Sequence, residues 1–145
     1  MSERAAPERR EAYRHFTGIS TRWADNDVYG HANNVVYYAW FDTAVNAWLI
    51  EQGFLDPAAS PVIGLVVETG CRYFASVGFP DALEAGLAVA RLGTSSIVYE
   101  VGIFAAGGQA AVAEGRFVHV MVDRATQKPT AIPDAMRRGL EALLR

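Results

Sequence analysis

The sequence is poor in three features that would point to particular classes of protein: cysteine, lysine and long apolar runs. Cys71 is the only cysteine among 145 residues, so no disulfide can form within the chain. Lys128 is the only lysine, and the other basic residues are arginines scattered along the sequence. No stretch approaches the roughly 18 consecutive apolar residues that a membrane-spanning helix needs. These absences exclude a disulfide-stabilised scaffold and a membrane-inserted protein.

The net charge and the distribution of basic residues argue against a nucleic-acid partner. The formal net charge is −3, and no basic stripe with interleaved aromatic residues is present. Nucleic acid is therefore not an expected partner. The first 14 residues are charged and lack the apolar core of a signal peptide. We expect a cytoplasmic protein. The flanks of Cys71 alternate as in a strand, which favours a packed thiol over a nucleophile.

The order of expected elements indicates one α+β domain. Residues 1–12 are expected to be a disordered or frayed leader, and residues 13–145 a single domain. Strands are predicted over residues 13–23, 62–74, 82–92, 96–105 and 109–123, and helices over residues 34–52 and 133–144. Four consecutive strands without intervening helices predict an antiparallel sheet. Gly107 and Gly108 predict a tight hairpin between the last two strands.

The longer predicted helix is the most apolar segment of the chain. Residues 34–52 contain no proline or glycine and are apolar nearly all round, so the helix must be surrounded by protein. Asn33 or Asn34 is a good N-cap, and Gly53 follows where a helix end favours a left-handed residue. One sheet wrapped around this helix would bury it. The uncovered edges of such a sheet favour a dimer.

A polar loop, residues 24–31, precedes that helix. Asp27 lies in it and could be a reactive carboxylate or only a turn former. Asp25 is expected to cap the loop or pair with Arg22. His31 could contact a substrate carbonyl, order a water molecule or brace the loop. A metal site built from Asp25, Asp27 and His31 fits by ligand type, but no histidine or cysteine repeats at metal-ligand spacing, and we expect no metal.

The loop and the helix start resemble the signature of hotdog-fold acyl-CoA thioesterases of the 4-hydroxybenzoyl-CoA thioesterase type. The residues that carry the resemblance are Arg22, Trp23, Asp25, Asp27, Gly30, His31, Asn33, Asn34, Tyr37 or Tyr38, Phe41 and Asp42. Weaker similarity covers residues 14–143. The resemblance implies a hotdog fold, in which a five-stranded antiparallel sheet wraps one long buried helix. It also implies hydrolysis of acyl-CoA without a cofactor, in a homodimer that pairs into a homotetramer.

Carried over to this sequence, the resemblance makes Asp27 the nucleophile or general base. Backbone N–H groups near Asn33 and Asn34 would polarise the thioester carbonyl, with His31 as a further member of the catalytic set. Unpaired N–H groups at a helix start suit this task because negative charge develops on the carbonyl oxygen. The expected substrate-binding residues are Tyr29, Gly30, Tyr37 and Tyr38. Arg72, Arg91 or Arg124 could bind the CoA phosphates.

Other interpretations stay open at this point. Another branch of hotdog thioesterases places its carboxylate on the helix, where Asp42 lies, although we expect Asp42 to be a structural hydrogen-bonding residue. Glu68 is expected to pair with Arg72. A hotdog enoyl-CoA hydratase is disfavoured because no Asn-Pro step accompanies the loop. A non-catalytic acyl-CoA-binding or regulatory module is a third possibility, since fold alone does not fix function.

Overall fold

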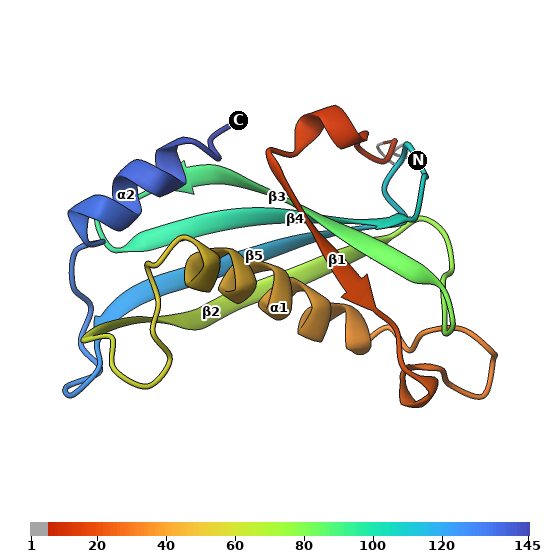
Figure 1. Ribbon diagram of the computed structural model, residues 1–145, viewed down its shortest axis with the longest axis horizontal. Helices are drawn as coiled ribbons and strands as arrows, with labels where there is room; N and C mark the ends of the chain where they lie inside the picture. Colours follow the sequence, from red (N-terminus) through yellow and green to blue (C-terminus); the bar gives the residue numbers. More distant parts are fainter. Residues whose placement is uncertain (1–5) are drawn as a thin grey trace, which may run out of the picture.

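The computed structural model, which describes residues 6–145, contains one five-stranded antiparallel sheet that curves around a long helix (Figure 1). The strands lie in the order β1-β3-β4-β5-β2. Their bounds are β1 His15–Ser20, β2 Val62–Tyr73, β3 Ala82–Leu92, β4 Ser96–Ala105 and β5 Ala113–Asp123. The helices are α1 Val36–Glu51 and α2 Asp134–Glu141. Three-residue 3-10 turns lie at Arg10–Ala12 and Trp23–Asp25. This α+β architecture confirms the predicted hotdog-like fold.

Helix α1 packs in the centre because its apolar side chains meet the inner face of the sheet. Phe41, Val45 and Leu49 are fully or almost fully buried, together with Tyr99 of β4. Gly115 of β5 leaves the space that the Phe41 ring occupies, and a Cβ there would collide with it. Gly53 follows α1 with a φ of +78°, which confirms the predicted left-handed residue at the helix end.

Several boundaries differ from the sequence predictions. Strand β1 covers His15–Ser20 rather than residues 13–23, and α2 covers Asp134–Glu141 rather than residues 133–144. Helix α1 begins at Val36 rather than at residue 34, because residues 33–36 form a tight turn closed by the Val36 N–H and the Asn33 C=O at 3.0 Å. Strand β5 begins at Ala113 rather than at residue 109. Gly107 has a φ of +75° and does form a turn, but the connection is longer than a two-residue hairpin.

The N-terminal segment explains the longer connection. Residues 8–12, which the sequence places in the frayed leader, lie against the sheet in the structure. Arg9 forms an isolated antiparallel bridge with Ala110, and the Ala111 N–H donates to the Glu8 C=O at 2.9 Å. Tyr13 then packs on the outer face of the sheet, against Gly102. The part of the predicted leader over residues 1–5 lies outside the described residues.

The expected ion pair between Glu68 and Arg72 is wrong. Glu68 instead pairs with Arg116 at 3.2 Å, and Arg72 pairs with Glu114 at 3.0 Å. Both bonds cross from β2 to β5, since neighbouring strands lie closer than two residues four positions apart on one strand. The register of β2 also shifts between Val66 and Glu68, so the simple alternation assumed for this strand does not hold.

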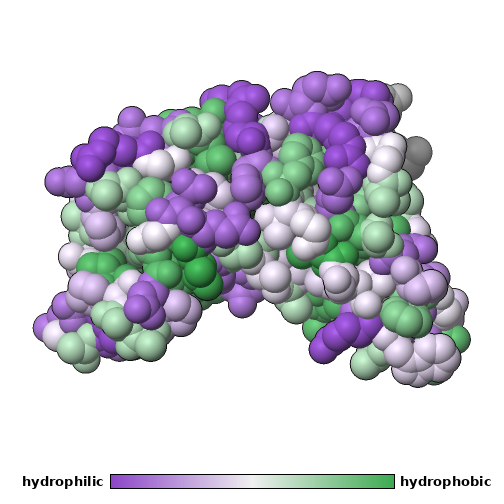
Figure 2. All heavy atoms as spheres, viewed as in Figure 1, coloured by the Kyte–Doolittle hydropathy of each residue, from purple (hydrophilic) through white to green (hydrophobic). Residues whose placement is uncertain are grey.

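The surface is hollowed at its lower edge in Figure 2, between the loop that precedes α1 and the loop that follows it. Strand β2 borders this hollow and is one of the two edges of the sheet. Val66 and Val67 on β2 are 46% and 59% exposed. Within residues 6–145, no helix is long and apolar enough to cross a membrane.

His119 of β5 is a buried titratable group in the core. Its side chain is almost fully buried, its Nδ1 has no hydrogen-bond partner within residues 6–145, and Gly64, Tyr99 and Phe117 surround its ring. Burial disfavours the charged imidazolium and lowers the pKa of His119 from 6.5 to about 4. The unfolded chain therefore binds a proton between these two pH values that the folded chain does not bind.

We expect the free energy of unfolding to fall by about 3 kcal/mol as the pH drops from 6.5 to 4, from His119 alone. The part of the stability that depends on neutral His119 is fully present above pH 6.5 and is lost as the pH falls toward 4. Urea unfolding at a series of pH values measures this slope. His119→Phe should flatten the slope over this interval. Equal slopes for wild type and His119→Phe would contradict the prediction.

Candidate active site

Asp25 holds the polar loop closed. Its carboxylate is 1% exposed and accepts two hydrogen bonds from the Arg22 guanidinium, at 2.7 and 2.9 Å, and one from the Arg22 N–H at 2.8 Å. Its C=O accepts the Asn33 N–H at 2.9 Å, so one residue ties both ends of the loop. These contacts confirm the structural role predicted for Asp25. They also raise the pKa of Arg22, mainly through the side-chain hydrogen bond.

Asp27 begins a tight turn at the tip of the loop. The Gly30 N–H donates to the Asp27 C=O at 3.1 Å, and Gly30 has a φ of +86°, a conformation that glycine adopts readily. Asp27 Oδ1 accepts the Tyr29 N–H at 2.9 Å. Since this bond occupies one oxygen, Oδ2 is the oxygen without a hydrogen bond to any described residue. Asp27 is thus a turn former and also carries an available carboxylate oxygen.

Most of the backbone N–H groups just before α1 are already hydrogen-bonded within the protein and so cannot bind a substrate oxygen. The Asn33 N–H is bonded to Asp25, and the Val35 N–H donates to the Asn33 Oδ1 at 3.0 Å. Asn33 therefore caps the turn before the helix. Within residues 6–145 the Asn34 N–H has no hydrogen-bond partner. Of the backbone donors predicted around Asn33 and Asn34, the one at Asn34 is free.

Two cavities meet at Asp27. One, of about 420 Å³, is lined by Asp27, His31, Ala32, Asn34, Tyr37, Tyr73, Phe74, Ala75 and Ser76. The other, of about 690 Å³, is lined by Trp23, Asn26, Asp27, Val28, Tyr29, Gly30 and Asn33. Asp27 lies at the wall of both. The smaller cavity brings its carboxylate together with the residue that holds the free N–H.

The predicted site residues divide between these cavities. His31, Asn34 and Tyr37 lie at the smaller one, whereas Tyr29, Gly30 and Asn33 lie at the larger one. Tyr38 lines neither; it is half-buried, with its ring edge-on to Phe41 at a centroid distance of 6.0 Å. The His31 C=O accepts the Asp27 N–H at 3.0 Å, so His31 braces the turn through its main chain. Its exposed imidazole makes no hydrogen bond to any residue in 6–145.

Three other parts of the site were not predicted, because they come from distant segments or from an exposed side chain. Trp23 is 83% exposed and stands at the wall of the larger cavity. Tyr73 ends β2 and reaches the start of α1. The Ala32 N–H donates to the Val77 C=O at 2.8 Å, which clamps the loop against residues 77–79. The β-rich pattern around Tyr73 predicted its strand, but nothing in it indicated what the side chain would contact.

The remaining candidates have structural surroundings. Asp42 is exposed and accepts a hydrogen bond from Asn46 Nδ2 at 3.0 Å, which confirms its expected structural role. Burial raises the pKa of Cys71 to about 11, as for a packed thiol. Arg124 binds main-chain oxygens of Pro57 and Ser60. In the described part of the chain, no three His, Cys, Asp or Glu side chains are grouped so as to hold a metal ion.

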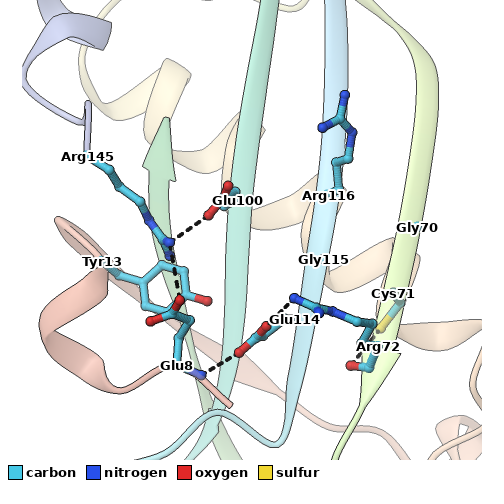
Figure 3. A pocket seen from close by; sticks show the side chains of 10 residues that line it. All are labelled: Glu8, Tyr13, Gly70, Cys71, Arg72, Glu100, Glu114, Gly115, Arg116 and Arg145. Atoms are coloured by element: carbon cyan, nitrogen blue, oxygen red, sulfur yellow. Dashed lines mark hydrogen bonds and ion pairs between the residues drawn. The ribbon is translucent and has the colours of Figure 1, made fainter. Parts of the chain in front are cut away.

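A third cavity, of about 460 Å³, lies on the outer face of the sheet (Figure 3). Its charged side chains already neutralise one another. Arg145 bonds to Glu100 at 2.8 Å, and Glu114 binds Arg72. The Tyr13 hydroxyl points into this cavity. The guanidinium carbon of Arg145 lies over the Tyr13 ring, 4.9 Å from the ring centroid. The cavity thus lies where Glu8, Tyr13 and Arg145 meet the sheet, apart from Asp27.

Comparison with known families agrees with this geometry. Residues 21–140 match the Thioesterase-like superfamily, a span that includes the loop, α1 and all strands except β1. The chain belongs to this superfamily. The match confirms the resemblance inferred from the loop motif. Among proteins with curated descriptions, none matches this thioesterase-like chain.

Solved structures give the same fold. The PA5185 protein from Pseudomonas aeruginosa is 57% identical, with a TM-score of 0.93 and coverage of 97% of each chain. The PA2801 protein from the same organism is 31% identical, with a TM-score of 0.81 over 88% of this chain and 98% of that one. Slr0204 from Synechocystis, a 1,4-dihydroxy-2-naphthoyl-CoA thioesterase, is 16% identical, with a TM-score of 0.77 and coverage of 86% and 93%. This last likeness concerns the fold alone.

Proposed function

We propose that the protein hydrolyses acyl-CoA thioesters to a free acid and CoA, with Asp27 as the reactive carboxylate. The observation that carries the proposal is the shared cavity of about 420 Å³, which Asp27 and Asn34 both line. The carboxylate supplies a base or nucleophile. The free Asn34 N–H, at the positive end of the α1 dipole, supplies a donor for the carbonyl oxygen.

The reaction needs both groups. In the general-base route, Asp27 takes a proton from a water molecule whose oxygen bonds to the carbonyl carbon. Negative charge then develops on the carbonyl oxygen, which the Asn34 N–H stabilises. The C–S bond breaks, and the CoA thiolate leaves and takes up a proton. In the nucleophilic route, the Asp27 oxygen bonds to the carbonyl carbon directly, the C–S bond breaks, and the CoA thiolate leaves and takes up a proton. Water then hydrolyses the resulting mixed anhydride, which releases the free acid and restores the Asp27 carboxylate.

Family membership supports a thioester as the reacting group, and Slr0204 acts on a CoA thioester with an aromatic acyl group. The larger cavity beside Asp27 suits an apolar acyl group. Trp23, Val28 and Tyr29 line it and are each at least 80% exposed. Desolvating exposed apolar side chains favours binding. The smaller cavity, with Asn34 and Ser76, suits the polar pantetheine arm.

Thiol release from a panel of acyl-CoA and aroyl-CoA thioesters tests this proposal. We expect purified protein to release free CoA, with a rate that depends on the acyl group. Binding of acyl-CoA without thiol release across the panel would favour the non-catalytic module. Hydration of crotonyl-CoA without thiol release would favour the hydratase.

We also expect a homodimer, and a homotetramer by further pairing of dimers. Strand β2 supplies an unpaired edge for this association, because it bonds only to β5 within residues 6–145. The exposed Val66 and Val67 on this edge would be buried by a partner sheet.

A further inference from the structure

We propose that Tyr73 is a positioning residue, whose hydroxyl selects the tight turn before α1 and so fixes the free N–H of Asn34. The catalytic consequence of this inference rests on the proposed function. Tyr73 comes from the end of β2, 39 residues away from Asn34 in the sequence. The contact therefore joins the sheet directly to the helix entry.

The key contact is a hydrogen bond from the Tyr73 hydroxyl to the Asn34 C=O at 2.8 Å. In a regular α-helix, that C=O would accept the N–H four residues later, which belongs to Tyr38. Here the Tyr38 N–H donates to the Val35 C=O instead, at 3.2 Å. The turn before α1 is tightened to bonds three residues apart, and Tyr73 satisfies the C=O that this geometry leaves over.

The peptide unit between Asn34 and Val35 is held at both ends from outside the helix. Tyr73 bonds its C=O, and the Asn33 side chain bonds its N–H at 3.0 Å. On the other side of Asn34, the loop holds Asn33 through its N–H bond to Asp25. The free Asn34 N–H thus lies between two anchored positions, so its direction is fixed before substrate arrives. Fixed donors are the ones that stabilise a transition state best.

Tyr73 is itself well anchored for this task. Its backbone pairs with Ala113 in the sheet, and its ring packs edge-on against the Tyr37 ring at a centroid distance of 5.0 Å. Burial raises the pKa of Tyr73, and the neighbouring Cys71 raises it further. The hydroxyl therefore stays protonated at neutral pH and remains a donor.

Removal of the Tyr73 hydroxyl should allow the residues before α1 to adopt the regular α-helical turn instead of the tight turn. Without Tyr73 as donor, the Asn34 C=O can accept the Tyr38 N–H, which extends α1 toward its N-terminus. The peptide units around Asn34 would then rotate into the helical direction. The ring, the packing against Tyr37 and the strand pairing would all remain in Tyr73→Phe, so the variant isolates the hydrogen bond.

The experiment compares Tyr73→Phe with Tyr99→Phe, which removes a buried hydroxyl that has no partner within residues 6–145. We expect Tyr73→Phe to lower kcat for thiol release about 10-fold, with KM and the melting temperature close to wild type. The amide NMR signals of Val35 and Tyr38 should shift in Tyr73→Phe and not in Tyr99→Phe. A loss of stability alone would lower the melting temperature instead of separating kcat from KM.

The outcomes keep the two proposals apart. If wild type releases thiol and Tyr73→Phe matches its kcat within twofold, the positioning role is overturned and the proposed function stands. If wild type releases no thiol, the proposed function fails, and the NMR comparison alone decides whether Tyr73 sets the turn. Unshifted Val35 and Tyr38 amides in Tyr73→Phe would overturn the inference in either case.

Discussion

Asp27→Asn should lower kcat for thiol release by at least about 100-fold, because general-base or nucleophilic catalysis by a side chain contributes about 10²–10⁴-fold. Asparagine keeps an Oδ1 that can accept the Tyr29 N–H, the bond that shapes the turn. The loop and the two adjoining cavities should therefore keep their form. We expect acyl-CoA binding to change by less than about threefold, since the lost group acts on water or on the carbonyl carbon.

Asp42→Asn is the matched control for this variant. It removes the same charge from an exposed aspartate whose side chain bonds to Asn46 on α1. It also tests the alternative in which the catalytic carboxylate lies on the helix. Thiol release should be close to wild type in Asp42→Asn. The assignment of Asp27 fails if Asp27→Asn keeps more than a tenth of the wild-type kcat, or if Asp42→Asn loses the larger share.

Features set by local sequence were the ones that could be predicted. The absence of glycine and proline over residues 34–52, with apolar side chains all round, predicts a buried helix, and Gly53 marks its end. Asp25 lies three residues from Arg22, so their pairing needs only one turn of chain. In each case the interacting groups are neighbours in sequence, and elementary geometry brings them together.

Features that depend on the register between distant strands could not be predicted. The pairing of Glu68 with Arg116 follows from the alignment of β2 with β5 and from the irregularity near Val66. The docking of residues 8–12 depends on the shape of the connection before β5. The contact of Tyr73 with Asn34 likewise needs the end of β2 to meet the start of α1. Sequence pattern alone contains none of these alignments.

The candidate site shows the same division. The motif pointed to Asp27 and to backbone donors near Asn33 and Asn34, but it could not distinguish among the donors. That distinction depends on which N–H groups the loop already uses. Asp25 accepts the Asn33 N–H, and the Asn33 side chain accepts the Val35 N–H, so among residues 33–35 of the described chain the Asn34 N–H is the one without a partner. The structure thereby reduces the expectation that N–H groups at the helix start bind the carbonyl oxygen to a testable statement about the Asn34 N–H.

Asn34→Pro should lower kcat for thiol release by about 10²–10³-fold, as removal of one oxyanion donor does. Proline has no N–H, yet the turn can accept it. Asn34 is the second residue of the turn closed by Val36 and Asn33, a position that proline favours, and its N–H makes no bond within residues 6–145 that the change would break. Val35, next in the turn, has φ −66° and ψ −31°, values close to those of a 3-10 turn.

Asn34→Ala is the control that decides the meaning of this loss. Alanine removes the same exposed side chain and keeps the N–H, so its kcat should lie within about threefold of wild type. A large loss in both variants would assign the effect to the Asn34 side chain. Activity in Asn34→Pro equal to that in Asn34→Ala would remove the N–H from the mechanism. Because Tyr73 bonds the C=O of the same residue, both variants keep the contact that holds the turn, and only the donor to the substrate oxygen differs.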